Sequence, residues 1–151
     1  MNLFLAAIIV LFSPHGGCTD AIVREIQHAK TSVLVQAYSF TSAPIEAALA
    51  EARMRHLDVR VILDRSYQST TGKVEPELVT SNIAVMIDPK HAIAHNKVII
   101  VDAQTVVTGS FNFTNQAELM NAENLLIIHD ARIAAKYTAN WQAHAAHSVT
   151  P

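Results

Sequence analysis

The sequence contains little cysteine, glycine or proline. Cys18 is the single cysteine, which excludes an internal disulfide and a zinc cluster built from cysteines. Four glycines and five prolines in 151 residues, of which half are apolar, exclude a disordered or low-complexity chain. A chain of this length accommodates one domain with a sizeable core and leaves no room for a second. The composition therefore predicts a single globular domain.

Charge is also scarce, and neither sign dominates. Charged residues make up 16% of the chain, and 11 Lys and Arg against 13 Asp and Glu give a net charge of -2. Without a general basic field, any contact with nucleic acid must rest on a local patch.

The apolar run at residues 3–12 is ten residues long, too short to span a bilayer. Two interpretations stay open. Residues 1–12 are a signal-peptide remnant, or the run supplies the first strand of a domain over residues 8–147. A signal peptide would require a positively charged segment before the run and a recognisable cleavage site. Neither is evident in this sequence. We nevertheless favour a periplasmic or secreted location slightly over a cytoplasmic one.

Hydrophobic patterns predict alternating strands and helices, with a loop and a short helix between residues 65 and 80. This order predicts the α/β class, with a mixed, largely parallel sheet flanked by helices. The expected strands are 8–12, 32–40, 57–64, 83–87, 97–101, 105–113 and 124–128, and the expected helices are 21–29, 44–54 and 131–147.

Polar residues alternate along the two segments expected to form a hairpin. Residues two apart in a strand share a face, so His95 and Lys97 should project together, as should Ser110 and Asn112. Gly109 would leave room for a ligand to approach the backbone. An imidazole, an ammonium, a hydroxyl and an amide around one point suit a phosphate group. Lys97 would neutralise a phosphoryl oxygen, Ser110 and Asn112 would donate hydrogen bonds, and His95 would attack phosphorus.

Two carboxylates complete the candidate catalytic set. Glu123 lies just before the last strand and is placed to hold the second ring nitrogen of His95, which would fix the tautomer. Asp102 falls at the hairpin turn, and strand parity puts it on the face opposite His95. We therefore expect Asp102 to brace the hairpin or a lysine.

The complete string resembles a known signature. His95-x-Lys97, four residues, Asp102, six residues, then Gly109-Ser110-x-Asn112 is similar to the HKD motif of the phospholipase D superfamily, above all its small bacterial endonucleases with one motif per chain. The flanking segments 37–41, 108–114 and 121–124 look similar as well, so the resemblance covers residues 8–147. It implies a phospholipase D-like fold. It also implies a phosphodiesterase with His95 as nucleophile, Lys97 on the phosphate, and Ser110 and Asn112 helping to hold it.

The resemblance implies a second histidine as well. The superfamily uses a histidine from a second motif as the general acid, and this chain has one motif. One imidazole is poorly placed to act on both sides of phosphorus, so we expect an isologous homodimer with a composite active site. No metal and no cofactor are expected, because Lys97 and the neutral donors supply the charge stabilisation.

Three functions follow in order of preference. The first is a metal-independent endonuclease that hydrolyses DNA, with RNA as an alternative substrate, through a covalent phosphohistidine. The second is a phospholipase D or cardiolipin-type lipid hydrolase, because the expected site residues recognise the phosphate and hardly the groups esterified to it. The third is a catalytically inactive nucleic-acid-binding module.

The remaining histidines receive ordinary roles. His91 and His95 are four apart, the spacing of a helical metal pair, but Pro89 argues against a helix there, so zinc is disfavoured. His91 is left as a rim contact for substrate. His144 and His147 fall near the end of the last helix, where positive charge offsets the helix dipole.

Overall fold

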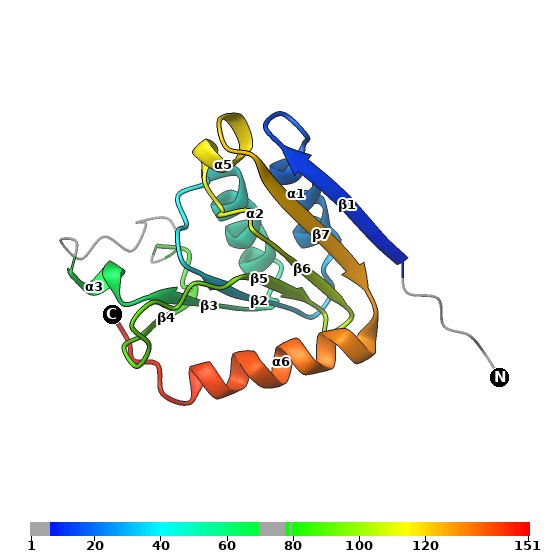
Figure 1. The fold of residues 1–151 in the computed structure, drawn as a ribbon. Helices are drawn as coiled ribbons and strands as arrows, with labels where there is room; N and C mark the ends of the chain where they lie inside the picture. The colour runs from blue at the N-terminus through cyan, green and yellow to red at the C-terminus, as the bar shows by residue number, and fades with distance from the viewer. Residues whose placement is uncertain (1–6, 70–77, 79) are drawn as a thin grey trace.

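The computed structural model describes residues 7–69, 78 and 80–151, and shows one sheet covered by helices on both faces (Figure 1). The sheet order is β1-β7-β6-β5-β2-β3-β4. The strands are β1 (Ala7–Ser13), β2 (Ser32–Ala37), β3 (Asp58–Asp64), β4 (Ala84–Asp88), β5 (Lys97–Val101), β6 (Thr105–Gly109) and β7 (Glu123–His129).

The α/β class and the mixed, helix-flanked sheet are confirmed, but the parallel share is smaller than expected. Only β2, β3 and β4 are parallel neighbours. The other four pairs are antiparallel: β1 with β7, β2 with β5, β5 with β6, and β6 with β7. Two of these pairs are antiparallel because β5, β6 and β7 follow one another through connections without a crossover, so each strand returns beside its predecessor.

The helices divide between the two faces. Figure 1 shows α1 (Cys18–His28) and α2 (Ala43–Met54) on one face and α6 (Ala131–Ala145) on the other. Along β5, alternate side chains serve two cores: Ile99 packs on the α1–α2 side, and Val98 on the α6 side. The short helices α3 (Ser66–Ser69) and α5 (Asn115–Leu119) lie in connections. Among the described residues, no helix is long and apolar enough to cross a membrane.

Helix α5 was not expected from the sequence, and it contributes to the start of α1. The carboxylate of Glu118 accepts hydrogen bonds from the backbone N–H groups of Gly17 (3.0 Å) and Thr19 (2.7 Å). A carboxylate about a hundred residues away in sequence thus satisfies N–H groups in the first turn, where no local side chain caps the helix.

Strand β6 ends at Gly109, four residues earlier than expected. Phe111 and Phe113 are nevertheless fully buried, as the alternation predicts. Phe113 pairs with Phe40 in an isolated parallel bridge, and their rings meet edge to face at 5.9 Å. The segment after β6 is thus anchored by aromatic packing.

Strand β1 is an edge strand with an apolar outer surface. Ile8, Val10 and Phe12 are 53%, 50% and 65% exposed. They point to the same side of the sheet as α6, but α6 packs over β2, β4, β5 and β6. The residues before Ala7 lie outside the described part, so a signal-peptide remnant in residues 1–12 stays a prediction.

Asp102 fastens the β5–β6 turn to the start of β2. Its carboxylate accepts hydrogen bonds from the backbone N–H groups of Lys30, Thr31 and Ser32 at 2.7–3.1 Å, and from the Thr31 hydroxyl at 2.9 Å. Burial alone would raise the pKa of Asp102, but these hydrogen bonds hold it below its ordinary value. The carboxylate is therefore structural and ionised at neutral pH.

We expect Asp102→Asn to lower the free energy of unfolding by about 1–3 kcal/mol at pH 7, because charge-assisted hydrogen bonds are lost. Asparagine tolerates the positive φ of 54° at this turn. A lowered native pKa stabilises the fold above the unfolded pKa of about 3.9, and this contribution disappears as the pH falls through the native pKa. The difference from wild type should therefore shrink in urea titrations at pH 3.

The matched control is Asp58→Asn, which removes an exposed carboxylate bound to Arg60 on the surface. It should change stability little at either pH. Equal losses for Asp102→Asn at pH 7 and pH 3 would contradict the proposed role of its charge.

Candidate active site

His95 lies in the loop that enters β5, not on the strand itself, and its side chain is exposed. Two hydrogen bonds hold this loop. The Ala94 N–H donates to the Asp64 carboxylate at 2.7 Å, and the Tyr38 N–H donates to the Asn96 carbonyl at 3.0 Å. The nucleophile candidate is thus presented to solvent from a backbone fixed on both sides.

Tyr38 brings His95 and Lys97 to the same side. The centroids of the Tyr38 and His95 rings are 4.6 Å apart, and Lys97 Nζ lies 5.2 Å from the Tyr38 centroid. Lys97 Nζ also donates to the backbone carbonyl of His95 at 2.8 Å. The shared face expected from the spacing is present, although regular strand begins only at Lys97.

Lys97 is a buried cation, 7% exposed. Burial lowers its pKa from the ordinary value, and the negative charge of Glu123 works in the opposite direction. Lys97 and Glu123 are therefore electrostatically coupled, even though the nearest contacts of the carboxylate are to other residues.

Glu123 is held by two neighbours at the start of β7. Its Oε2 accepts from the Ser110 hydroxyl at 2.5 Å, and its Oε1 accepts from Asn121 Nδ2 at 3.0 Å. Within the described part of one chain, no hydrogen bond joins Glu123 to the His95 ring. The contact expected between these two side chains is not formed.

The residues after β6 differ from their expected roles in detail. The Ser110 hydroxyl donates a hydrogen bond to Glu123 and accepts one from the Asn124 N–H at 3.0 Å, so it orients the carboxylate. Asn112 Oδ1 is buried and has no hydrogen-bond partner among the described residues. The space beside Gly109 is taken by protein, because a Cβ there would lie 2.2 Å from the Asn124 carbonyl oxygen. Its lack of a side chain serves strand packing.

Asp102 is separated from this group. His95, Lys97, Ser110 and Glu123 gather where β5 begins and β6 ends, whereas Asp102 follows the opposite end of β5. Among the candidate catalytic residues it is the one that the fold places away from the site, where it binds the backbone of residues 30–32.

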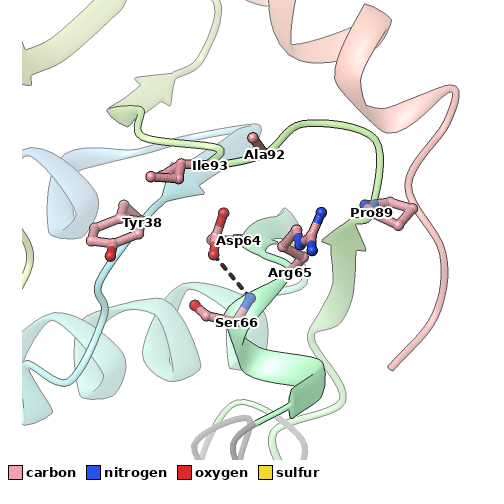
Figure 2. A pocket seen from close by; sticks show the side chains of 7 residues that line it. All are labelled: Tyr38, Asp64, Arg65, Ser66, Pro89, Ala92 and Ile93. Atoms are coloured by element: carbon pink, nitrogen blue, oxygen red, sulfur yellow. Dashed lines mark hydrogen bonds between the residues drawn. The ribbon is translucent and has the colours of Figure 1, made fainter.

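A cavity of about 620 Å³ opens beside Tyr38 (Figure 2). Its floor includes Asp64, which is 2% exposed and accepts from the Ser66 N–H at 2.9 Å. Burial would raise the pKa of Asp64, but backbone hydrogen bonds hold it below the ordinary value. The other lining residues are Arg65, Ser66, Pro89, Ala92 and Ile93.

Tyr38 and Asp64 are the two site residues that sequence reasoning missed. Tyr38 stands inside the segment 37–41 that carries part of the resemblance, which was a usable signal. Asp64 was visible only as the last residue of a strand, and its bond to Ala94 spans thirty residues.

Side chains of the types that can bind a metal ion gather at another place, around Asp88. The ring of His91 lies with those of His144 and His147 around Asp88, so His91 is not a partner of His95. Burial alone would raise the pKa of Asp88, but the imidazoles of His144, His91 and His147 and the Lys90 N–H hold it well below its ordinary range. Beyond the helix-dipole role expected for them, His144 and His147 thus face a buried carboxylate.

Comparisons with known proteins bear on the family of this chain. The family model described as "Cardiolipin synthase, PLD-like domain" matches residues 22–145. A phospholipase D from Rickettsia felis is 44% identical over 140 residues, which is 93% of this chain and 70% of that protein. A mitochondrial cardiolipin hydrolase from Xenopus laevis is 33% identical, covering 80% of this chain and 58% of that protein.

A solved structure is similar over nearly its full length. The phospholipase D family member Nuc from Salmonella typhimurium superposes with a TM-score of 0.89 at 35% identity, covering 97% of this chain and 99% of that one. The relation therefore extends over the sheet and all the residues of the candidate site.

We expect Glu123→Gln to lower the pKa of Lys97 further, because it removes the charge that opposes the effect of burial. The pKa can be followed by NMR titration of the lysine side-chain carbon and nitrogen. Glu51→Gln, an exposed change on α2, should leave it unmoved. A rise in the Lys97 pKa on loss of Glu123 would show that this coupling is wrong.

Proposed function

The chain belongs to the phospholipase D superfamily of phosphodiesterases, and we propose that it hydrolyses DNA through a covalent bond between His95 and phosphorus. One observation carries the proposal. The exposed His95 imidazole forms no hydrogen bond with any described residue, and it stands beside the buried Lys97 ammonium on the shared ring of Tyr38. A nucleophile available to substrate beside a fixed positive charge suits attack on a phosphodiester.

In the proposed first step, a ring nitrogen of His95 forms a bond to phosphorus as the bond to the leaving oxygen breaks. That oxygen takes a proton from a general acid. Water then attacks phosphorus and gives a proton to the same general acid, which lost its proton in the first step, as the nitrogen–phosphorus bond breaks and a phosphate monoester leaves. Lys97 balances negative charge on the phosphoryl oxygens in both steps, and no metal is required for this sequence. The Asn112 amide is proposed to donate a hydrogen bond to the phosphoryl group through Nδ2.

The general acid is proposed to be His95 of a second copy. Helix α5 contacts β1 and ends at Leu119, and Leu119 and the following Met120 are 48% and 76% exposed. This apolar surface, defined here as Ile8, Val10, Phe12, Leu119 and Met120, adjoins the site. The link is direct, because β1 residue Ser13 pairs with Glu123 and its hydroxyl donates to the Asn121 carbonyl at 3.0 Å. A two-fold axis at this edge would bury the surface and bring two sites together.

DNA is preferred as substrate on two grounds. The single motif resembles that of the small endonucleases of the superfamily, and the cavity beside Tyr38 is bordered by the exposed cation Arg65. Lys90 is exposed on the adjoining loop. The chain has a net charge of -2, so binding of the sugar–phosphate backbone of DNA requires local positive charges such as these.

A lipid phosphodiester is the second candidate, and Ile93 favours it. This side chain is 57% exposed and lines the cavity two residues before His95. An apolar group at the rim would contact acyl chains. Both candidates use the same chemistry at phosphorus.

We expect His95→Ala to reduce cleavage of plasmid DNA by at least about 10³-fold, because the attacking nitrogen is removed. Activity is measured in excess EDTA, with phosphatidylcholine and cardiolipin vesicles as parallel substrates. The control is His28→Ala, an exposed histidine at the end of α1. Cleavage of the vesicle lipids without cleavage of the plasmid would show that the substrate is a lipid and not DNA. Undiminished cleavage by His95→Ala would favour the non-catalytic nucleic-acid-binding module.

We expect Phe12→Asp to convert a dimer into a folded monomer and to lower activity at least about tenfold, because a charge at the centre of an apolar contact is costly to desolvate. Mass is measured by light scattering on a sizing column, and folding by circular dichroism. Met54→Asp, at another exposed apolar position, should stay dimeric and active. A monomeric wild-type protein with full activity would contradict the composite site.

A further inference from the structure

The buried carboxylate of Asp88 is surrounded by three imidazoles at the end of β4. Its side chain has no exposed surface. Asp88 Oδ2 lies 2.9 Å from His91 Nδ1 and 2.8 Å from His144 Nδ1, and Asp88 Oδ1 lies 3.2 Å from His147 Nε2. One ligand atom from each of the four residues lies within 4.8 Å of all the others.

Two distant segments of the chain build this cluster. Asp88 and His91 come from the end of β4 and the following loop, whereas His144 and His147 come from the end of α6 and the tail after it. The tail is fixed by a backbone pair, in which Ile87 and Val149 exchange hydrogen bonds of 2.8 and 2.9 Å. The C-terminus therefore lies beside β4 (Figure 1).

Hydrogen bonding alone does not account for all three imidazoles. His91 and His144 each form a hydrogen bond with Asp88. His147 Nε2 is close to Asp88 but lacks hydrogen-bond geometry, and it is buried without another partner among the described residues. A buried ring nitrogen without a partner is costly unless a further group binds it.

We propose that Asp88, His91, His144 and His147 form a closed structural site for a divalent transition-metal ion of the zinc class. Imidazole nitrogen suits zinc, and a carboxylate oxygen completes a four-ligand set without an open position. Zinc–ligand bonds of about 2.0–2.2 Å place tetrahedral ligands about 3.3–3.5 Å apart. The distances of 2.8–3.2 Å from the Asp88 oxygens to the three imidazole nitrogens are already close to this separation. The four ligand atoms lie within 4.8 Å of one another, so the imidazole nitrogens need to move toward one another by about an ångström.

The site would control the loop that carries His95. Asp88 Oδ1 also accepts from the Lys90 N–H at 3.0 Å, and Pro89 and Ala92 of the same loop line the cavity beside Tyr38. An ion held between this loop and the tail would fix both to β4. None of its ligands belongs to the proposed catalytic group, so the inference does not depend on the proposed function.

The test is zinc binding to the full chain after removal of bound metal. We expect about one zinc ion per chain by calorimetry and elemental analysis. At free zinc about 100 times the dissociation constant, the melting temperature should rise by about 5–10 °C. Co²⁺ should give the visible bands of a tetrahedral site, and hydrogen exchange should slow in residues 89–96.

Variants decide which residues bind. His147→Ala and His91→Ala should each weaken zinc binding at least about 100-fold and abolish the tetrahedral cobalt bands, whereas His28→Ala should bind as wild type. His147 is near the C-terminus and partly exposed, so its variant is expected to keep the circular dichroism of the fold. Failure of the wild type to bind zinc, or equal binding by the His147 and His91 variants, overturns the site.

Discussion

The antiparallel pairing of β5 with β2 is the constraint on which the candidate site depends. It places Lys97 opposite Ala37, so that Tyr38, the next residue of the chain, meets both Lys97 and the loop before it. The register is set by burial on both faces, because Val98 and Ile99 enter different cores. A slip of one residue would move Lys97 to the α6 side and both apolar side chains to the wrong core. The cation is thus fixed by the packing of its neighbours.

Aspartates at the ends of strands hold the connecting loops of this sheet in place. Asp64 ends β3, Asp88 ends β4 and Asp102 follows β5, and each accepts backbone N–H groups from a connecting segment. Burial raises the pKa of each carboxyl, and hydrogen bonds reverse the shift, so each stays ionised at neutral pH. Charge-assisted bonds of this kind hold irregular backbone more firmly than neutral ones. The loop that carries His95 is held in this way by Asp64 from within and by Asp88 at its start.

The sequence predicted what local periodicity encodes and missed what distant segments create. The positions of the strands, though not all their ends, and the shared side of His95 and Lys97 follow from alternation along the chain. The burial of Phe111 and Phe113, which alternate with Ser110 and Asn112, fits the same pattern. The early end of β6 and the Asn124 carbonyl beside Gly109 depend on β7, which local alternation does not place. Likewise, its place just before the last strand singled out Glu123, but only the fold shows that Ser110 and Asn121 hold its carboxylate.

The histidines illustrate the same limit and connect it to function. His144 and His147 meet His91 only because the tail pairs with β4, a contact that no local spacing predicts. His95 is the opposite case, because its motif is local but its proposed action is incomplete within one chain. Its exposed ring and the exposed apolar edge next to Glu123 lie at the same end of the sheet. Exposed edge strands and apolar surfaces favour association, and a net charge of -2 opposes it weakly. In the proposed dimer, a second copy would cover the apolar edge and would also supply the second imidazole.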